Sequence, residues 1–224
     1  MQRIKNTAIF IARGGSERVK NKNIKKFHGK PILYWTHKII KKSKFFQNIV
    51  LSSDSEKILK VGKKIGFDIL IKRPKNISDN YSNTEEVVNH AIKDLSKNMK
   101  IENICCVYPC SVFMKISSLK KAFMILKKNP NSLIFPIMQH SHPLERSLML
   151  SKDNRIKFYS RKSFYKRTQD LKPKYFDTGQ FYLAKNTTWL KKNKTRFGIE
   201  ISKYSSIDID TVVDWNQAKL MFKS

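Results

Sequence analysis

The sequence lacks any apolar run that approaches the ~20 residues a membrane-spanning helix needs. Its first apolar stretch, residues 8–12, is also too short for the hydrophobic core of a signal peptide. Cysteine is scarce, with Cys105, Cys106 and Cys110 the only three. Their close spacing suits neither a disulfide framework nor a zinc site, so we expect buried or inert thiols. Together these absences predict a cytoplasmic protein with no membrane partner.

Acidic residues are also few, because 17 Asp and Glu stand against 46 Lys and Arg, a formal net charge of +29. Such a basic chain is compatible with nucleic-acid binding. The lysines do not form one cluster, however, and come mostly as pairs in helix-like segments, such as Lys41-Lys42 and Lys127-Lys128. We therefore favour a solvated lysine-rich surface with no nucleic-acid partner. A small anionic substrate suits the same charge.

No internal repeat and no long linker interrupts the 224 residues, so we expect a single domain over residues 1–224. Strand-like and helix-like segments alternate as far as residue 138. The predicted strands are residues 7–12, 48–53, 68–72, 104–108 and 132–138, and helix-like segments begin at Pro31, Ser55, Ser82 and Ser117. Ser82 has capping-box spacing with Glu85. This alternation predicts an α/β, Rossmann-like fold, a mostly parallel sheet with helices on both faces.

The alternation of strand-like and helix-like segments stops between residues 139 and 175, where the pattern predicts no regular helix. Residues 146–150 and 155–159 flank a turn-like Lys-Asp-Asn at residues 152–154. We expect a hairpin excursion here, inserted before the fold resumes with residues 176–184, 198–202 and 211–222.

The loop after the first predicted strand is basic and carries two glycines. In open α/β sheets, ligands bind at the carboxyl ends of the strands. Gly14 and Gly15 let the backbone approach an anion, and four cations follow or flank them: Arg13, Arg18, Lys20 and Lys22. The inferred ligand is a polyphosphate, although the loop is neither a P-loop nor GxGxxG, and an ordinary strand-to-loop turn is the alternative.

Two carboxylates near the carboxyl terminus, Asp208 and Asp210, are spaced two residues apart. On an extended segment they point to the same side, an arrangement that suits Mg²⁺ facing phosphates. The alternative is that these acids belong to the first turn of the last helix, with Thr211 as its cap. Asp214 fits that alternative well.

Three spaced motifs carry a resemblance to a known family. "ARGGS" at residues 12–16 is followed by "KN" at 22–23, "RTQDL" at 167–171 by "DTGQFY" at 177–182, and "SIDIDT" at 206–211 by "DW" at 214–215. In this order, over essentially the whole chain, they resemble the sugar-acid cytidylyltransferases, which make CMP-activated sialic-type acids. The middle motif resembles the pseudaminic acid branch of that family more closely than the sialic acid branch.

The resemblance implies nucleotidyl transfer, in which CMP passes from CTP to a nonulosonic acid, most closely pseudaminic acid, and pyrophosphate leaves. It also implies Mg²⁺ as cofactor and a homodimer in which residues 139–175 reach into the partner's site. Two alternatives stay open. One is CMP activation of N-acetylneuraminic or legionaminic acid, and the other is a non-catalytic, basic nucleic-acid-binding protein that reuses the fold.

The resemblance also assigns roles to single residues. It implies that the loop at residues 78–84 borders the base. The nucleotide contacts would be Arg13, Gly14, Gly15, Ser16, Lys22, Asn23 and Arg73; the catalytic residues Arg13, Lys22 and Asp210; the metal ligands Asp208 and Asp210; and the sugar contacts Arg167, Gln180 and Tyr182. The chain departs from the family at Glu17, where the loop usually carries a lysine, and matches it only loosely at residues 108–113 and 142–146. We interpret His140 and His142 as part of a solvated loop.

Overall fold

A computed structural model of the chain describes residues 6–78 and 82–222. The strands of its main sheet are β1 (Asn6–Ile11), β4 (Asn48–Ser53), β5 (Ile69–Lys72), β6 (Asn103–Val107), β7 (Ser132–Gln139), β10 (Tyr175–Asp177), β11 (Phe181–Lys185) and β12 (Thr195–Glu200). Their order is β10-β7-β11-β6-β1-β4-β5, with β12 also paired to β7. β1 pairs in parallel with β4 and β6, β4 with β5, and β12 with β7, whereas β11 is antiparallel to its neighbours. The predicted mostly parallel sheet is confirmed.

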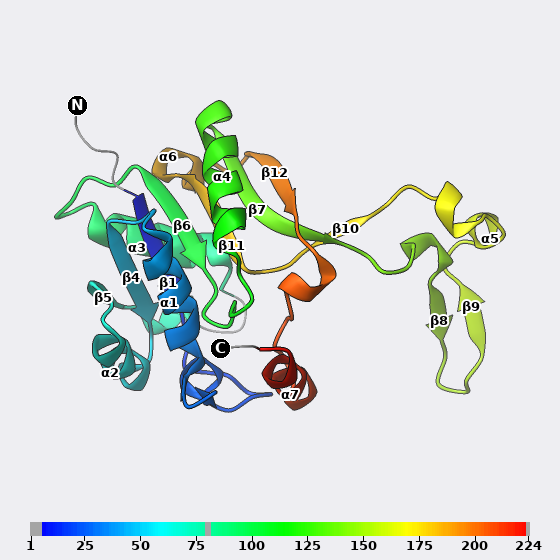
Figure 1. Ribbon diagram of the computed structural model, residues 1–224, viewed down its shortest axis with the longest axis horizontal. Helices are drawn as coiled ribbons and strands as arrows, with labels where there is room; N and C mark the ends of the chain where they lie inside the picture. The colour runs from blue at the N-terminus through cyan, green and yellow to red at the C-terminus, as the bar shows by residue number, and fades with distance from the viewer. Residues whose placement is uncertain (1–5, 79–81, 223–224) are drawn as a thin grey trace.

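Helices cover both faces of this sheet, as predicted (Figure 1). Side chains alternate along β1, so that Ala8 and Phe10 join one buried cluster and Ile9 another. The first cluster packs under α1 (Ile32–Ser43), α2 (Glu56–Ile65) and α4 (Ile116–Lys128). The second packs under α3 (Thr84–Leu95) and α6 (Asn186–Trp189). Among the described residues, no helix is long and apolar enough to cross a membrane.

A third apolar cluster joins the start of the chain to its last helix, α7 (Val212–Met221). Phe27, at the end of β2 (Lys26–Phe27), packs edge-on against Trp215 of α7, with 5.5 Å between the ring centroids. β2 pairs with β3 (Lys30–Pro31), and Val19 from the opening loop is buried in the same cluster. This packing holds the basic loop at residues 13–23 next to the segment that carries Asp208 and Asp210.

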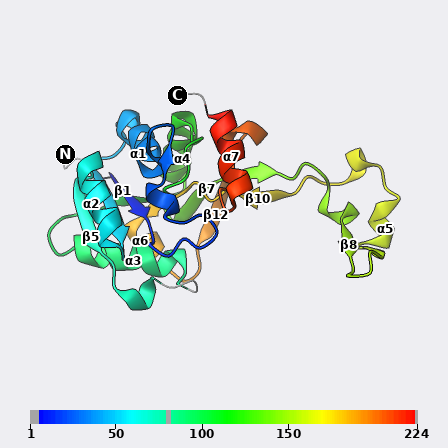
Figure 2. The same cartoon turned by 90° about the horizontal axis from the view of Figure 1, so that it is seen from below.

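The predicted hairpin excursion is confirmed, although its strands are shorter than expected. β8 (Leu148–Leu150) pairs with β9 (Ile156–Phe158), and α5 (Arg161–Phe164) follows. Both views show this arm projecting away from the sheet and its helices (Figures 1 and 2). Its two strands carry side chains that are exposed although they are large and apolar, namely Leu148, Met149, Leu150, Ile156 and Phe158.

Two local predictions were wrong. The capping box of α3 uses Asn83 and Glu86 rather than Ser82 and Glu85, since Glu85 instead forms an ion pair with the buried Lys194 at 3.1 Å. The predicted strand at residues 176–184 is broken into β10 and β11, because Gly179 adopts a left-handed conformation with φ of 60°.

The lysines are less evenly placed than we expect from the sequence. Helices α1, α2 and α4 share one face of the sheet and carry eleven lysines but a single acid, Glu56. Helix α3, on the other face, carries one lysine and three acids. Spacing along the chain does not reveal which helices will share a face.

Candidate functional site

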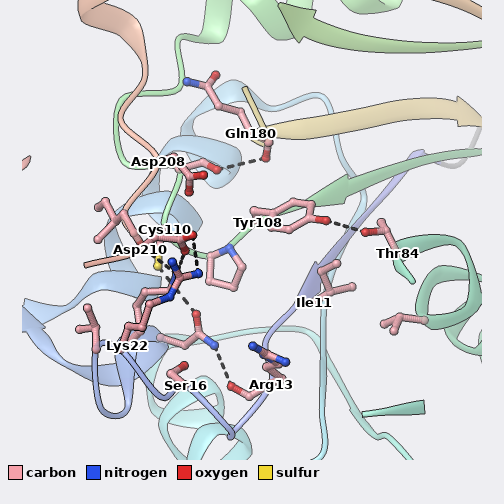
Figure 3. A pocket seen from close by; sticks show the side chains of 18 of the residues that line it. Ile11, Arg13, Ser16, Lys22, Thr84, Tyr108, Cys110, Gln180, Asp208 and Asp210 are labelled. Carbon is pink, nitrogen blue, oxygen red and sulfur yellow. Dashed lines mark hydrogen bonds and ion pairs between the residues drawn. The ribbon is translucent and has the colours of Figure 1, made fainter. Parts of the chain in front are cut away.

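A cavity of about 540 Å³ opens where β1 and β6 end, at the carboxyl edge of the parallel strands (Figure 3). Its wall comes from all of residues 178–180 and 206–210 and from part of residues 11–23, 73–78, 82–87 and 108–113. The described residues of the loop at 78–84 that line it are Ser78, Ser82 and Thr84, while residues 79–81 lie outside the described residues. A cavity at this edge is where open α/β sheets bind their ligands.

Asp210 faces two cations of the opening loop across this cavity. Its carboxylate pairs with the Arg18 guanidinium at 2.8 Å and with the Lys22 ammonium at 3.2 Å. Lys22 Nζ also donates to the backbone carbonyl of Ile209 at 2.6 Å, which fixes its position. Asp208 lies on the same wall, and burial together with the neighbouring Asp210 carboxylate raises the pKa of Asp208. The structure thus brings together the loop cations and both carboxylates that the sequence singled out.

The neighbouring Asp214 is a helix cap, as the alternative interpretation of these acids predicted. Its Oδ2 accepts hydrogen bonds from the backbone N–H of Thr211 at 2.7 Å and of Asp210 at 3.1 Å. The bonds from Thr211 lower the pKa of Asp214. Thr211 in turn accepts from the Asp214 N–H, which completes a capping box at the start of α7. Asp214 therefore stabilises the helix end, while Asp208 and Asp210 face the cavity.

The two glycines of the opening loop do not line the cavity. The Gly14 N–H donates to Asp54 Oδ1 at 2.9 Å, so the structure uses it to fasten the loop. Asn23 is buried, and its amide donates to the Arg13 carbonyl at 2.9 Å. Arg13, Ser16 and Lys22 have side chains on the cavity wall. Asn23 and Gly14 thus set the shape of a loop from which Arg13, Ser16 and Lys22 face the ligand space.

Arg73 lies on the same wall but is only 4% exposed. Its Nε donates to Ser78 Oγ at 3.0 Å, and its Nη2 lies 3.6 Å from Asp54 Oδ1. Burial lowers the pKa of Arg73, and Asp54 opposes that shift. Sequence reasoning missed Asp54. The signal that points to it is its position directly after the buried strand β4, at the same sheet edge as Arg13.

The three predicted sugar contacts are not brought together within one chain. Gln180 lines the cavity, but it is 3% exposed and its amide donates to the Ser205 carbonyl at 2.5 Å. Tyr182 lines a smaller neighbouring cavity of about 210 Å³ and donates to Asp177 at 2.7 Å. Arg167 lies on the projecting arm, in an exposed ion pair with Asp170.

Two more residues at this edge, Tyr108 and Thr84, lie in segments that the sequence analysis named only as ranges, 108–113 and 78–84. Tyr108 lines the main cavity, and its hydroxyl shares a 2.5 Å hydrogen bond with Thr84 at the start of α3. The two cavities share Thr84, and the rings of Tyr108 and Tyr182 lie 5.9 Å apart. The two cavities thus adjoin at Thr84, with Tyr108 on the wall of one and Tyr182 on the wall of the other.

None of the three cysteine thiols is placed to act as a reactive nucleophile. Cys105 and Cys106 are buried in the sheet, as expected, and burial raises the pKa of the cavity residue Cys110 to about 12. A thiolate nucleophile is therefore absent from this wall at neutral pH. No group of three or more His, Cys, Asp or Glu side chains is placed to hold a metal within residues 6–78 and 82–222. A cation bound by Asp208 and Asp210 would take its other ligands from water and phosphate, as Mg²⁺ commonly does.

Comparison with known proteins agrees with this geometry. The sequence profile described as "Cytidylyltransferase" matches residues 7–224. A pseudaminic acid cytidylyltransferase of Campylobacter jejuni is 33% identical over 98% of this chain and 97% of its own. A Helicobacter pylori protein named pseudaminic acid cytidylyltransferase and UDP-2,4-diacetamido-2,4,6-trideoxy-beta-L-altropyranose hydrolase is 36% identical over 80% of this chain and 34% of its own. The N-acylneuraminate cytidylyltransferase of Oncorhynchus mykiss is 26% identical, over 95% and 49% of the two chains.

Solved structures agree on the fold. A CMP:2-keto-3-deoxy-manno-octonic acid synthetase complexed with CTP superposes with a TM-score of 0.71 over 97% of this chain and 98% of that one, at 10% identity. A 4-diphosphocytidyl-2C-methyl-D-erythritol synthase of Anaerococcus prevotii gives 0.61, over 97% of each chain, at 14% identity. The Rossmann-like architecture is confirmed, and so is the resemblance to the pseudaminic acid branch. With a family profile that spans all but its first six residues, the chain belongs to the cytidylyltransferase family.

Proposed function

We propose that this protein joins CMP from CTP to a nonulosonic acid, with pseudaminic acid as the preferred acceptor, and releases pyrophosphate. The observation that carries the proposal is the cavity in which loop cations face two carboxylates at the carboxyl edge of the sheet. Similarity over nearly the whole chain to pseudaminic acid cytidylyltransferases supports the choice of acceptor. A reaction that consumes CTP also fits the expected cytoplasmic location.

The reaction needs a positioned triphosphate and stabilisation of its charge, not a covalent intermediate. The anomeric hydroxyl of the sugar acid loses its proton to solvent as its oxygen forms a bond to the α-phosphorus, and the bond from that phosphorus to the pyrophosphate oxygen breaks. Arg13 and Lys22 hold the triphosphate, with a hydrogen bond from Ser16. Lys22 is well placed for this role because the Ile209 carbonyl holds its ammonium on the cavity wall.

Asp208 and Asp210 would hold Mg²⁺. The donor set fits, because two carboxylates lie on one wall and one of them carries a raised pKa that a bound cation would lower. When bound, the ion supplies positive charge that polarises the phosphoryl oxygens. The helix cap made by Asp214 holds the backbone N–H groups of Asp210 and Thr211 and so fixes the chain at the second of these carboxylates.

In this proposal a second chain completes the acceptor side, because Arg167 lies on the arm and not at this chain's cavity. The exposed apolar side chains of β8 and β9 form an apolar surface that is unusual for a monomer, and a second copy of the chain covers it in the proposed homodimer. Residues 139–175 are the dimerisation arm, and the planar guanidinium of Arg167 matches the carboxylate of the sugar acid in the partner's cavity.

The test is pyrophosphate release from CTP, measured with pseudaminic, legionaminic and N-acetylneuraminic acid in turn. We expect release only when a sugar acid is present, fastest with pseudaminic acid, and none in EDTA. Release from CTP with no acid, or none with any acid, contradicts the proposal. Salt-dependent binding of DNA or RNA without turnover would instead identify a nucleic-acid-binding protein.

A further inference from the structure

The two cations that hold Asp210 are anchored in different ways. Lys22 has a second partner in the Ile209 carbonyl, and 23% of its side chain is exposed. Arg18 is 67% exposed, and its ion pair with Asp210 is the one polar contact that the structure gives it within the described residues. Arg18 is therefore held by one direct contact, to Asp210, and more weakly attracted by the nearby carboxylates of Asp208 and Asp214.

Asp210 needs these cations only while no other positive charge is close. It shares the cavity wall with the Asp208 carboxylate, and Asp214 follows in the helix cap. Under the function proposed above, on which this inference rests, a divalent cation binds Asp208 and Asp210 and takes over the role of counter-charge. The weaker anchor then gives way, and the Arg18 guanidinium is released into the cavity that it already lines.

The triphosphate is a suitable partner for a guanidinium released at this place. The triphosphate brings its negative oxygens into the same cavity, and a planar fork of N–H donors binds two such oxygens at once. Glu17, the neighbouring residue, also lines the cavity and adds negative charge beside the triphosphate. Lys20 does not line the cavity, so it is not placed to offset the negative charge of Glu17 beside the triphosphate.

We propose that Arg18 is a movable counter-charge and a further catalytic residue. It neutralises Asp210 in the nucleotide-free protein, and it moves to the triphosphate when metal and CTP bind. Before the ligands bind, Arg18 offsets part of the negative charge of the carboxylates. After it moves, it brings a positive charge to the triphosphate, next to the negative Glu17. Arg18 thereby opposes binding of metal alone and favours binding of metal together with CTP.

The test compares Arg18→Ala and Arg18→Lys with Lys20→Ala, a matched control from the same loop. Nucleotide-free protein is titrated with Mn²⁺, read by electron paramagnetic resonance, and CTP affinity in Mg²⁺ is measured by calorimetry. We expect Arg18→Ala to bind Mn²⁺ about twofold to fivefold more tightly than wild type, the scale of one exposed ion pair. Its CTP affinity should fall about tenfold, the scale of one charge-assisted contact. Arg18→Lys should lie between, and Lys20→Ala should match wild type in both.

Unchanged or weaker Mn²⁺ binding by Arg18→Ala would overturn the exchange, because a merely structural residue weakens both ligands together. Unchanged CTP binding would overturn the move to the triphosphate. Thermal melting checks the fold, and Arg18→Gln, which keeps the stem and loses the charge, replaces the alanine variant if that protein unfolds. The Mn²⁺ measurement needs no sugar acid. An absence of turnover in wild type would therefore count against the proposed function, whereas the Mn²⁺ result decides this inference.

Discussion

Asp54 Oδ1 accepts a hydrogen bond from the Gly14 backbone N–H at 2.9 Å. The same oxygen lies 3.6 Å from the buried guanidinium of Arg73. One carboxylate at the end of β4 thus fastens both the basic loop after β1 and the arginine after β5. Because the ends of neighbouring parallel strands share one sheet edge, Gly14 and Arg73 both reach Asp54 although they lie 40 and 19 positions away from it in the sequence.

Gly14→Ala and Gly15→Ala form a matched pair that tests how closely the loop approaches β4. A Cβ on Gly14 would lie 2.9 Å from the Ser55 Cβ, whereas a Cβ on Gly15 meets nothing within 4 Å. We expect Gly14→Ala to displace the loop and to lower kcat/KM for CTP about 10²-fold, the scale of a misplaced catalytic group. Gly15→Ala should change it little, and an equal loss in both variants would contradict the fastening role of Gly14.

Asp54→Ala should lower the free energy of unfolding by about 3 kcal/mol, because it leaves the buried Arg73 charge without its partner. Asp54→Asn keeps an oxygen that accepts from Gly14 and should lose less. Urea unfolding measures both. The exposed pair of Asp94 and Lys97 supplies the control, since Asp94→Ala should cost under about 1 kcal/mol. Equal losses of unfolding free energy in Asp54→Ala and Asp94→Ala would contradict the role of Asp54 as the partner of the buried Arg73 charge.

Asp208→Asn should make the metal-free protein more stable at neutral pH while it removes activity. Burial and the Asp210 and Asp214 carboxylates raise the pKa of Asp208, although Lys22 and Arg18 oppose them. A raised pKa means that the ionised form opposes folding, so stability falls as the pH rises from the unfolded value of about 4 through the folded pKa. Below pH 4 the variant and wild type should agree. Urea unfolding in EDTA at several pH values gives the answer, and a variant that is less stable at pH 7 would contradict the electrostatics of the site.

Mixing two inactive variants tests the proposed exchange of arms between protomers. Arg167→Ala lacks the arm residue, and Asp210→Asn lacks a residue of the cavity. In a mixed dimer, the intact arm of one protomer meets the intact cavity of the other. Random reassociation therefore restores about a quarter of the wild-type sites. No recovery after mixing, with dimers confirmed by light scattering, would place Arg167 outside the partner's site.

The sheet could be predicted because each strand and helix is indicated by the pattern of residues within its own short segment. Short apolar runs such as residues 7–12 and 104–108 alternate with amphipathic segments, and that pattern alone favours a parallel sheet. The cavity position of Arg13 and Lys22 followed from the same reasoning, because they lie in the loop after the first strand, whereas Asp208 and Asp210 were recognised by their two-residue spacing and by the family resemblance.

Contacts between distant segments could not be predicted in this way. Nothing near Gly14 in the sequence shows that Asp54 will take its N–H, or that the Gln180 amide will bind the Ser205 carbonyl. The capping box of α3 lies one residue later than predicted, at Asn83 and Glu86, and Glu85 instead pairs with Lys194, which is 109 positions away. Arg167 lies on the arm, apart from the cavity of its own chain, and its place in a partner's cavity stays a prediction.

The most direct test of the central claim is competition between two acceptors in one tube. Wild-type protein, CTP and Mg²⁺ receive equal concentrations of pseudaminic acid and N-acetylneuraminic acid, and mass spectrometry measures the two CMP products at early times. We expect the CMP adduct of pseudaminic acid to exceed the other by at least about tenfold, since each unpaired polar group in a site costs ~1–3 kcal/mol. Equal products, or an excess of the N-acetylneuraminic acid adduct, would contradict the proposed acceptor.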